Sequence, residues 1–223
     1  FGGRAWALVP PASIALVVAA IALDPGVADW LTWVAFVAVP PLAATALGWA
    51  GRGARPALAL LAVPVLALAW ADSGGLAGDA AAAALTALSC VTLGRLLAGI
   101  VPGAWLKAAI VAMAVIDAVL VFGNQLQGPN AVLNAAVPAH GLPQLQYLDL
   151  HAASLGYGDV FVAGLMGGVL AAERARQRPV ALLVLALSAV WDVLFVAFDT
   201  LPATVPVAAA LLITETARRP LRR

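Results

Sequence analysis

The sequence predicts an all-α fold, a polytopic bundle of about eight transmembrane helices. Of its 223 residues, 64% are hydrophobic and only 10% are charged, and the mean hydropathy is +1.01. A soluble domain is about half apolar and about a quarter charged. The apolar residues also fall into runs close to the length of about 20 residues that crosses a bilayer as a helix. Because backbone polar groups cannot stay unpaired in hydrocarbon, helices are the expected spanning elements.

Eight apolar runs define the expected spans in chain order. At about 1.5 Å of rise per residue, most of them approach the thickness of the hydrocarbon core, about 30 Å. The runs cover residues 5–23, 29–50, 56–72, 79–100, 104–123, 153–172, 179–198 and 201–216. Residues 124–150 differ, because Pro129, Pro138 and Pro143 interrupt a stretch that contains Asn, Gln and His. We expect an interfacial loop there, with a short amphipathic piece at VLNAAV.

The charged residues agree with a topology of eight spans. If each run crosses the membrane once, all twelve Lys and Arg residues fall on one side. The acidic residues on the other side are Asp24, Asp29, Asp72, Asp79, Asp149 and Asp199. The positive-inside rule makes the basic side cytoplasmic, with both visible ends of the chain on it. Eleven of the twelve basic residues are arginine and alanine is abundant, which favours a prokaryotic inner (plasma) membrane. The net charge of +1 gives no indication of a nucleic-acid partner.

Three aspartates lie inside the expected spans, at Asp117, Asp159 and Asp192. A charge at the bilayer centre costs about 2.5–3.5 kcal/mol, so such residues are functional candidates by default. Asp117 and Asp159 each lie six residues from the outer end of their span, which places both roughly 9 Å below the outer boundary. Two carboxylates from separate helices are therefore expected at one depth. Asp192 is equally far from the outer end of its own span, so depth alone leaves it as an alternative partner.

A pair of neighbouring aspartates has a specific chemical use. Two carboxylates that lie close together share a proton, so the ionised one can draw a proton from water while the protonated one donates to a carbonyl oxygen. Water then adds to a peptide bond without a covalent intermediate. A serine or cysteine nucleophile is disfavoured, because the two histidines, His140 and His151, lie in or beside the loop. A metal centre is disfavoured as well, because these histidines do not have metal-ligand spacing on one helix. No cofactor is expected.

Two glycines, Gly156 and Gly158, stand just before Asp159 in the stretch LGYGDV. Small residues let neighbouring membrane helices approach closely, and glycine also permits backbone that departs from helical geometry. We therefore expect close helix packing beside Asp159. Gly164, Gly167 and Gly168 provide further small positions on the same helix.

Three motifs follow one another in the second half of the chain: IDAVLVFG at 116–123, LGYGDV at 155–160 and LPATVP at 201–206. On these motifs the chain resembles the GxGD intramembrane aspartyl proteases, the family of presenilins and signal peptide peptidases. IDAVLVFG is similar to the helix with the family's first aspartate, LGYGDV matches GxGD, and LPATVP resembles the PAL motif. The separation of 42 residues between the aspartates and the inside-to-outside direction of the Asp117 helix are closer to signal peptide peptidases. The resemblance covers about residues 104–216.

The resemblance implies an aspartic endopeptidase that cleaves within the membrane, with Asp117 and Asp159 as its catalytic pair. The residues it implies for substrate binding are Gly156, Tyr157, Gly158, Leu201, Pro202, Ala203 and Thr204. The substrate would be a transmembrane peptide or a signal peptide, and membrane lipid would surround the enzyme. Residues 1–100 would form a helical scaffold and residues 101–223 the catalytic helices. Pro202 and Pro206 hinder a regular helix start, so we expect free backbone groups there that pair with an extended substrate.

The chain also differs from the family pattern. Ile116 stands where the family has tyrosine, and Thr204 stands where the PAL motif has leucine. Four spans precede the Asp117 helix where the family has five, which leaves two readings open: a helix upstream of Phe1, or a shorter relative. The run GYGDVFVAGLMGG is also similar to the type IV prepilin peptidases, although Phe161 replaces their lysine. A proton-coupled transporter that uses the three intramembrane aspartates as a relay is the alternative from another class.

Overall fold

The computed structural model describes residues 3–149, 154–198 and 200–218. These residues are mainly helical, as the sequence predicts, and they include one small two-stranded sheet. Five helices are long and apolar enough to cross a membrane: Arg4–Leu23, Val27–Ala50, Leu76–Ile100, Gly103–Phe122 and Gln177–Val196. The helical segments Pro56–Ala71, Tyr157–Ala172 and Val205–Arg218 lie in the remaining predicted runs but are shorter. The helices support an integral membrane protein, and five of them have the full length of a span.

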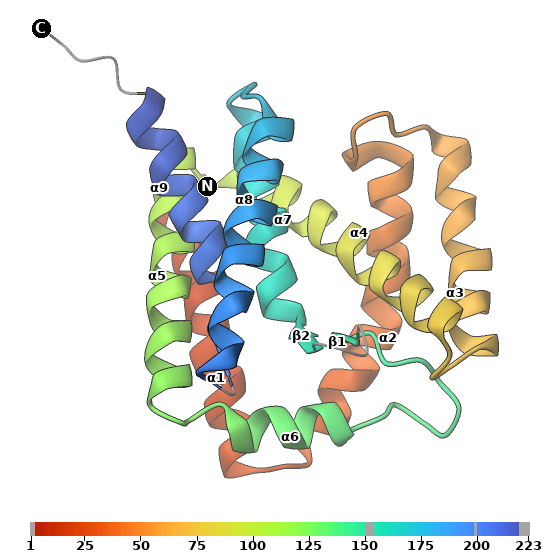
Figure 1. The fold of residues 1–223 in the computed structure, drawn as a ribbon. Helices are drawn as coiled ribbons and strands as arrows, with labels where there is room; N and C mark the ends of the chain where they lie inside the picture. The colour runs from red at the N-terminus through yellow and green to blue at the C-terminus, as the bar shows by residue number, and fades with distance from the viewer. Residues whose placement is uncertain (1–2, 150–153, 199, 219–223) are drawn as a thin grey trace, which may run out of the picture.

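The first half of the chain forms four helical segments joined by short turns (Figure 1). Their bounds are η1 Arg4–Leu8 with α1 Val9–Leu23, α2 Val27–Thr45 with η2 Ala46–Ala50, η3 Pro56–Leu61 with α3 Ala62–Ala71, and α4 Leu76–Ile100. Proline stands near the start of α1 and of η3, where its missing N–H has no helical partner to lose. Gly53 and Gly74 have φ values of 79° and 82°, a conformation that suits glycine and reverses the chain between helices.

The second half carries the three motifs. Its elements are α5 Gly103–Phe122, α6 Gln127–Ala135, β1 Tyr147–Asp149, β2 Ser154–Gly156, α7 Tyr157–Ala172, α8 Gln177–Asp192 with η4 Val193–Val196, and α9 Val205–Arg218. The predicted amphipathic piece begins at Val132 inside α6, which contacts α1 and α2 and lies across the lower end of the bundle in Figure 1. The region thus contains a short helix as expected, but the helix covers Gln127–Ala135 rather than the predicted VLNAAV, and residues 147–149 form a strand instead of loop.

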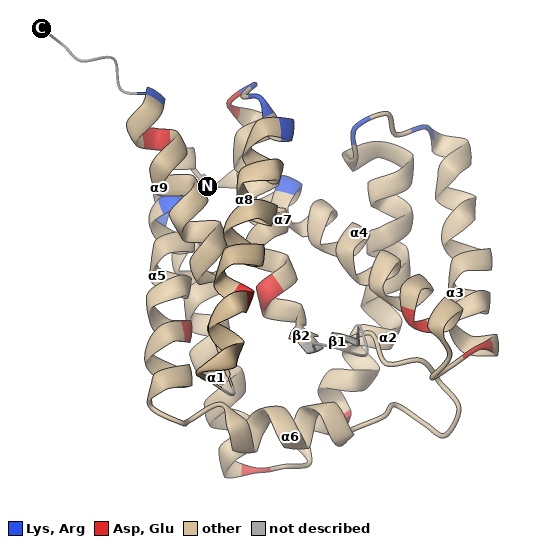
Figure 2. Ribbon diagram, viewed as in Figure 1, with Lys and Arg blue, Asp and Glu red and all other residues tan. Residues whose placement is uncertain are grey.

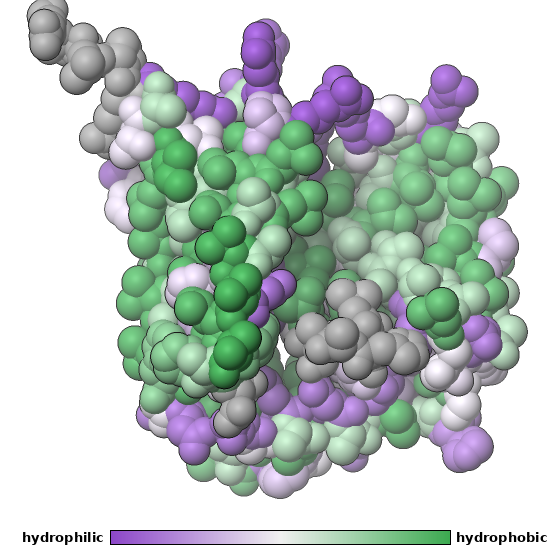
Figure 3. All heavy atoms as spheres, viewed as in Figure 1, coloured by the Kyte–Doolittle hydropathy of each residue, from purple (hydrophilic) through white to green (hydrophobic). Residues whose placement is uncertain are grey.

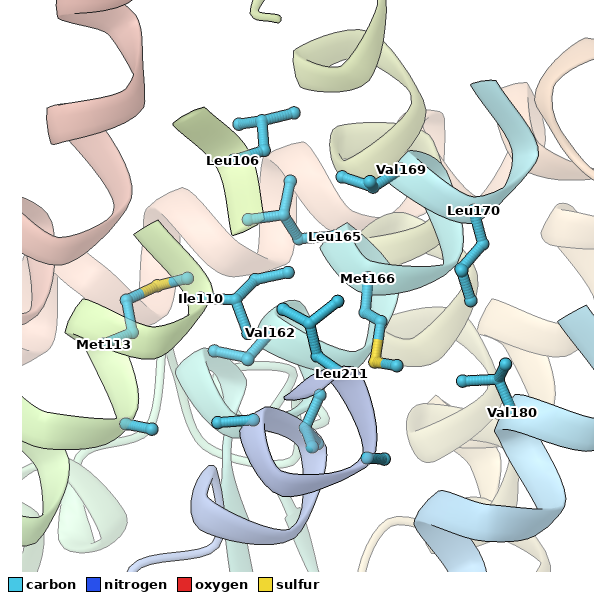
Figure 4. Packing of buried hydrophobic residues seen from close by; sticks show 14 of the residues in the cluster. Leu106, Ile110, Met113, Val162, Leu165, Met166, Val169, Leu170, Val180 and Leu211 are labelled. Carbon is cyan, nitrogen blue, oxygen red and sulfur yellow. The ribbon is translucent and has the colours of Figure 1, made fainter. Parts of the chain in front are cut away.

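Two hydrophobic clusters hold the helices together. One joins α1, α5, α7, α8 and α9, and Figure 4 shows its side chains from α5, α7 and α9 pointing toward one another, among them Ile110, Leu165 and Leu211. The other joins α2, α3 and α4 with Leu145 from the segment before β1. Burial is uneven, since Val180 is the only buried residue within α8. The helix α8 is therefore attached mainly through α9 and presents most of its surface outward.

The helices α4 and α7 pack against each other with their backbones in close approach. A Cβ atom added to Gly94 would meet the carbonyl oxygen of Gly164, one added to Gly164 would lie 2.6 Å from the carbonyl oxygen of Cys90, and one added to Gly168 would meet the carbonyl oxygen of Gly94. Glycine at these positions lets the two backbones touch, which is how small residues act between membrane helices. The predicted close packing thus occurs, but at Gly164 and Gly168. At Gly158 an added Cβ would meet no atom within 4 Å, so the expectation for that glycine was wrong.

The basic residues gather at one end of the helix bundle, and several acidic residues lie at the other end (Figure 2). Figure 2 shows Lys and Arg at the upper end of the bundle, where the α7–α8 turn and the η2–η3 turn also lie, whereas several acidic residues lie at the lower end. Figure 3 shows hydrophobic side chains covering the flanks between these two polar ends. The one-sided distribution of basic residues that the sequence predicts is therefore present in the fold.

Candidate active site

Asp117 lies in the fourth turn of α5 and is 8% exposed. Its partner is Thr204, which stands just before α9 and is 1% exposed. The Thr204 hydroxyl donates a hydrogen bond of 2.6 Å to Asp117 Oδ2, and the Thr204 backbone N–H approaches the same oxygen at 3.3 Å. Neither bond uses Oδ1. The buried carboxyl group therefore has a fixed orientation, and the third sequence motif supplies the group that fixes it.

Asp159 occupies the third position of α7, directly after the small sheet. Its Oδ2 accepts a hydrogen bond of 3.0 Å from the backbone N–H of Gly156, the residue that caps the helix. A carboxylate at this position satisfies a backbone donor that the helix start leaves unpaired and lies at the positive end of the helix dipole. A Cβ atom on Gly156 would lie 3.4 Å from this Oδ2. Glycine at 156 therefore leaves room for the carboxyl group to fold back onto the cap.

The two aspartates come from helices that contact each other, and the Asp117 carboxyl group lies within electrostatic range of Asp159. Of the three intramembrane aspartates in the sequence, these are the two that the fold brings together. Two carboxyl groups within electrostatic range disfavour joint ionisation, so that one can act as base while the other acts as acid. Each member also keeps a separate donor, Thr204 for Asp117 and Gly156 for Asp159. The arrangement is suited to general acid–base chemistry on a bound carbonyl group.

Tyr157 and Gly158 have different surroundings although they are adjacent. The Tyr157 hydroxyl lies 2.8 Å from Ser89 Oγ on α4. Because the Ser89 hydroxyl donates to the Thr86 carbonyl oxygen at 2.7 Å, the Tyr157 hydroxyl is the donor to Ser89. The Tyr157 N–H also donates to the Gln146 carbonyl oxygen at 3.1 Å. Tyr157 thus anchors the start of α7 to α4, whereas Gly158 borders open space beside Asp159.

The stretch LPATVP is non-helical from Leu201 to Thr204, and α9 begins at Val205. The irregular start that Pro202 predicts is confirmed. Pro206, in contrast, is the second residue of α9, a place where proline fits a regular helix start. The backbone of Thr204 is also engaged, because its N–H approaches Asp117 and its carbonyl oxygen accepts from the Ala208 N–H at 3.1 Å. Thr204 thus links this stretch to α5 through its two hydrogen-bond donors to Asp117.

A pair of short antiparallel strands precedes α7, a feature absent from the expectations drawn from the sequence. Strand β1 pairs with β2 in antiparallel register, with Tyr147 opposite Gly156 and Leu148 opposite Leu155. Gln146 positions the segment, because its side-chain amide donates to the Ala136 carbonyl oxygen at 3.0 Å and its backbone accepts from Tyr157. The strands have three residues each, too few for a period of two to be recognised among polar residues. The alternation QLQYLDL was the available signal.

The remaining candidates are not gathered at this pair. Asp192 is exposed at the end of α8, and His140 is exposed in the loop after α6. His151 lies outside the described residues. Within the described ranges, no group of three His, Cys, Asp or Glu side chains has the geometry to hold a metal ion. Cys90 is buried in α4. The candidate functional side chains of this site are thus Asp117, Asp159 and Thr204.

An ion-pair network, not expected from the sequence, joins the three helices of the site at their basic ends. Lys107 on α5 lies 2.6 Å from Glu173 at the end of α7 and 2.8 Å from Glu215 on α9. Arg218 on α9 lies 3.1 Å from the same Glu173 and 3.3 Å from Glu215. These side chains are between 19% and 35% exposed. The sequence feature that could have indicated this network is the presence of two glutamates, Glu173 and Glu215, at the end of the chain's helices where the basic residues gather.

Comparison with known proteins adds no relative: no family model, no curated protein and no solved structure matches the chain.

Proposed function

We propose that the chain is an intramembrane aspartyl protease of the signal-peptide-peptidase type, which hydrolyses peptide bonds within transmembrane segments. The observation that carries the proposal is the meeting of three separate motifs at one point. Asp117 from α5 and Asp159 from α7 interact, and Thr204 from the LPATVP stretch binds Asp117 through its hydroxyl. Asp117, Asp159 and Thr204 lie 42 and 45 residues apart along the chain, and helix packing alone gives no reason for them to converge on a carboxyl pair. The three motifs on which the GxGD resemblance rests contain these same three residues.

In the proposed reaction, one carboxylate removes a proton from water and the other carboxyl group donates a proton to the scissile carbonyl oxygen. The product of this addition is a neutral tetrahedral diol, so no charged oxyanion has to be stabilised. Thr204 keeps Asp117 oriented through Oδ2, which leaves Oδ1 for water or substrate. The Gly156 cap does the same for Asp159. Collapse of the diol then returns a proton to the leaving amine, and the pair regains its starting protonation state.

The surroundings of the pair favour an extended substrate. A helical substrate has its carbonyl groups engaged in its own hydrogen bonds, so a local stretch has to unwind before water can attack. The short β-hairpin before α7 offers strand edges with which an unwound stretch can pair. Gly158 leaves open space next to Asp159 where a side chain would otherwise stand. Leu201 and Pro202 closely precede Thr204, whose hydroxyl binds Asp117, so we assign them to the same substrate path.

For the topology we propose eight membrane crossings, with the basic ends of the helices in the cytoplasm of a prokaryotic cell. The shorter segments α7 and α9 would cross together with the polar hairpin and the LPAT stretch that precede them. All described Lys and Arg residues would then lie on one side, as the positive-inside rule requires. Transmembrane peptides and signal peptides inserted in the surrounding lipid would be the substrates.

The experiment is cleavage of a fluorogenic transmembrane peptide by purified protein in defined lipid. Asp117→Ala and Asp159→Ala should each abolish cleavage while the protein stays folded, because neither carboxyl group can serve as both base and acid alone. Asp192→Ala is the matched control, an aspartate of similar depth that is exposed on α8, and it should remain active. A peptide mimic with a hydroxyl in place of the scissile carbonyl should inhibit the wild type.

The outcomes separate the proposal from its alternatives. An inactive Asp192→Ala beside an active Asp117→Ala would show that α8 rather than α5 supplies the partner of Asp159. If no transmembrane peptide is cleaved but reconstituted vesicles carry a proton-dependent flux that all three variants abolish, the chain is a transporter with a carboxylate relay.

A further inference from the structure

A groove of about 630 Å³ lies at the basic end of the molecule, between the turn from α7 to α8 and the last turns of α9. Its rim is polar and includes Arg174, Arg176 and Arg218, while its walls include Val180, Leu183 and Ile213. Figure 3 shows hydrophilic side chains above hydrophobic flanks at this end of the bundle. The groove is thus divided between a cationic rim and an apolar wall that continues down the helices.

The cations on the rim are not equivalent. Arg218 pairs with Glu173 and Glu215, and Glu173 is also held by Lys107. Neither Arg174 nor Arg176 forms an ion pair with any residue that the structure describes, and both side chains are exposed. The single acidic residue of the groove lining, Glu173, is therefore neutralised by its own partners. Two arginines remain with unmatched charge directly over the apolar wall.

The backbone at Arg174 departs from the usual residue preference. Helix α7 ends with hydrogen bonds from the Ala175 N–H to the Leu170 carbonyl oxygen and from the Arg174 N–H to the Ala171 carbonyl oxygen. This is the Schellman pattern, in which the residue in the place of Arg174 takes left-handed geometry and is usually glycine. Arg174 has a φ of 53°, which is strained for a residue with a Cβ atom. The chain thus keeps an arginine at the groove where glycine would suit the backbone better.

We propose that this groove binds one anionic phospholipid from the membrane leaflet at the basic end. The phosphate group lies between Arg174 and Arg176, and an acyl chain lies along the apolar wall formed by α8 and α9. The occupant is argued from charge complementarity at the rim together with an apolar wall that faces the hydrocarbon. The next outward residues of α8, Leu182 and Leu185, are each 66% exposed, so the chain of the lipid continues onto a surface that is apolar as well. Basic pockets between membrane helices bind acidic headgroups in this way.

The site is independent of the proposed protease activity, because its residues contact neither Asp117 nor Asp159. Only insertion in a membrane is required. It does lie beside the ion-pair network, since Glu173 and Arg218 belong to both. A lipid that occupies the groove will therefore stabilise the ends of α7 and α9 against each other, and its binding is measurable as a rise in the unfolding temperature.

The test compares binding of phosphatidylglycerol and phosphatidylcholine to the purified full chain by native mass spectrometry, with unfolding temperature as a second measurement. The groove variant carries Arg174→Gly and Arg176→Ala. The matched control carries Arg52→Ala and Arg55→Ala, which removes two exposed arginines from the η2–η3 turn at the same end of the molecule. We expect the wild type to prefer phosphatidylglycerol. The groove variant should lose roughly fivefold in affinity per arginine, or about 25-fold together, while the control retains the preference.

Folding of the groove variant is not at risk from Arg174→Gly, because glycine adopts the left-handed geometry without strain. A second variant, Ile213→Trp, keeps both arginines and fills the apolar wall, and it should weaken phosphatidylglycerol binding without a change in charge. Equal losses in the groove variant and in the control would overturn the proposal in favour of general attraction to the basic end. Displacement of the lipid by millimolar inorganic phosphate would also overturn it, since the site would then recognise a free anion.

Discussion

The hydrogen bond from the Thr204 hydroxyl to Asp117 gives the sharpest prediction. Thr204→Val removes the hydroxyl and keeps the branched shape of a side chain that is 1% exposed. The bond is 2.6 Å long, whereas the backbone N–H that remains lies at 3.3 Å, beyond the usual range of about 2.7–3.2 Å for such a bond. A hydrogen bond to a charged group contributes about 1.5–3 kcal/mol. If orientation of Asp117 limits the chemical step, kcat/KM should fall about 10- to 150-fold.

The assay measures kcat and KM for a transmembrane peptide in defined lipid, together with the unfolding temperature. Thr204→Ser is the control, because it keeps a hydroxyl in the same place, and it should retain most of the activity. The loss in Thr204→Val should appear mainly in kcat, since substrate contacts remain, and the unfolding temperature should fall because a buried carboxyl group loses its main donor. Wild-type kcat in Thr204→Val would refute the reasoning. A drop that Thr204→Ser shares in full would mean that side-chain shape, rather than the hydroxyl, is what matters.

Three further predictions concern other parts of the same machinery. Gly168→Ala should destabilise the protein by about 1–3 kcal/mol, because the new Cβ atom meets the backbone of α4, whereas Gly167→Ala, with no atom within 4 Å of the added Cβ, should be neutral in thermal unfolding. Lys107→Ala should cost about 1–2 kcal/mol, since it leaves two glutamates with Arg218 as their remaining cation, and the cost should shrink in high salt. Cleavage should depend on pH as a bell, because a proton-sharing pair titrates in two steps; a rate that stays flat well below pH 4 and well above pH 8 would contradict a carboxyl pair.

The helices could be predicted from the sequence because hydrocarbon leaves a spanning segment few other choices. Apolar runs and their polar breaks locate the helical segments within a few residues, and Pro202 marks the irregular stretch before α9. The number of full-length spans is less predictable, since a run such as 201–216 includes residues that do not join the helix. An apolar composition alone does not show where the first helical hydrogen bond forms.

The details of the site depend on contacts between distant segments, which a single sequence does not encode locally. Thr204 looked like a departure from the leucine of the related motif, yet its hydroxyl binds Asp117. The glycines of α7 looked interchangeable, but the facing backbone of α4 separates Gly164 and Gly168, which permit contact, from Gly158, which borders open space. The hairpin from Tyr147 to Gly156 depends on Gln146 reaching back to Ala136. Each of these contacts forms between two different segments of the chain, so neither segment predicts it alone.

The shortness of α7 has a consequence for the supply of water. Its 16 residues span about 24 Å, less than the roughly 30 Å of hydrocarbon in a bilayer. In the proposed topology the missing length is supplied by the strands β1 and β2, and strand backbone is tolerated at membrane depth only where protein or water surrounds it. In that topology water would therefore reach toward Asp159 from the side of the two strands. A hydrolytic reaction at this place would draw its second reactant from a polar recess, without transfer of each water molecule through lipid.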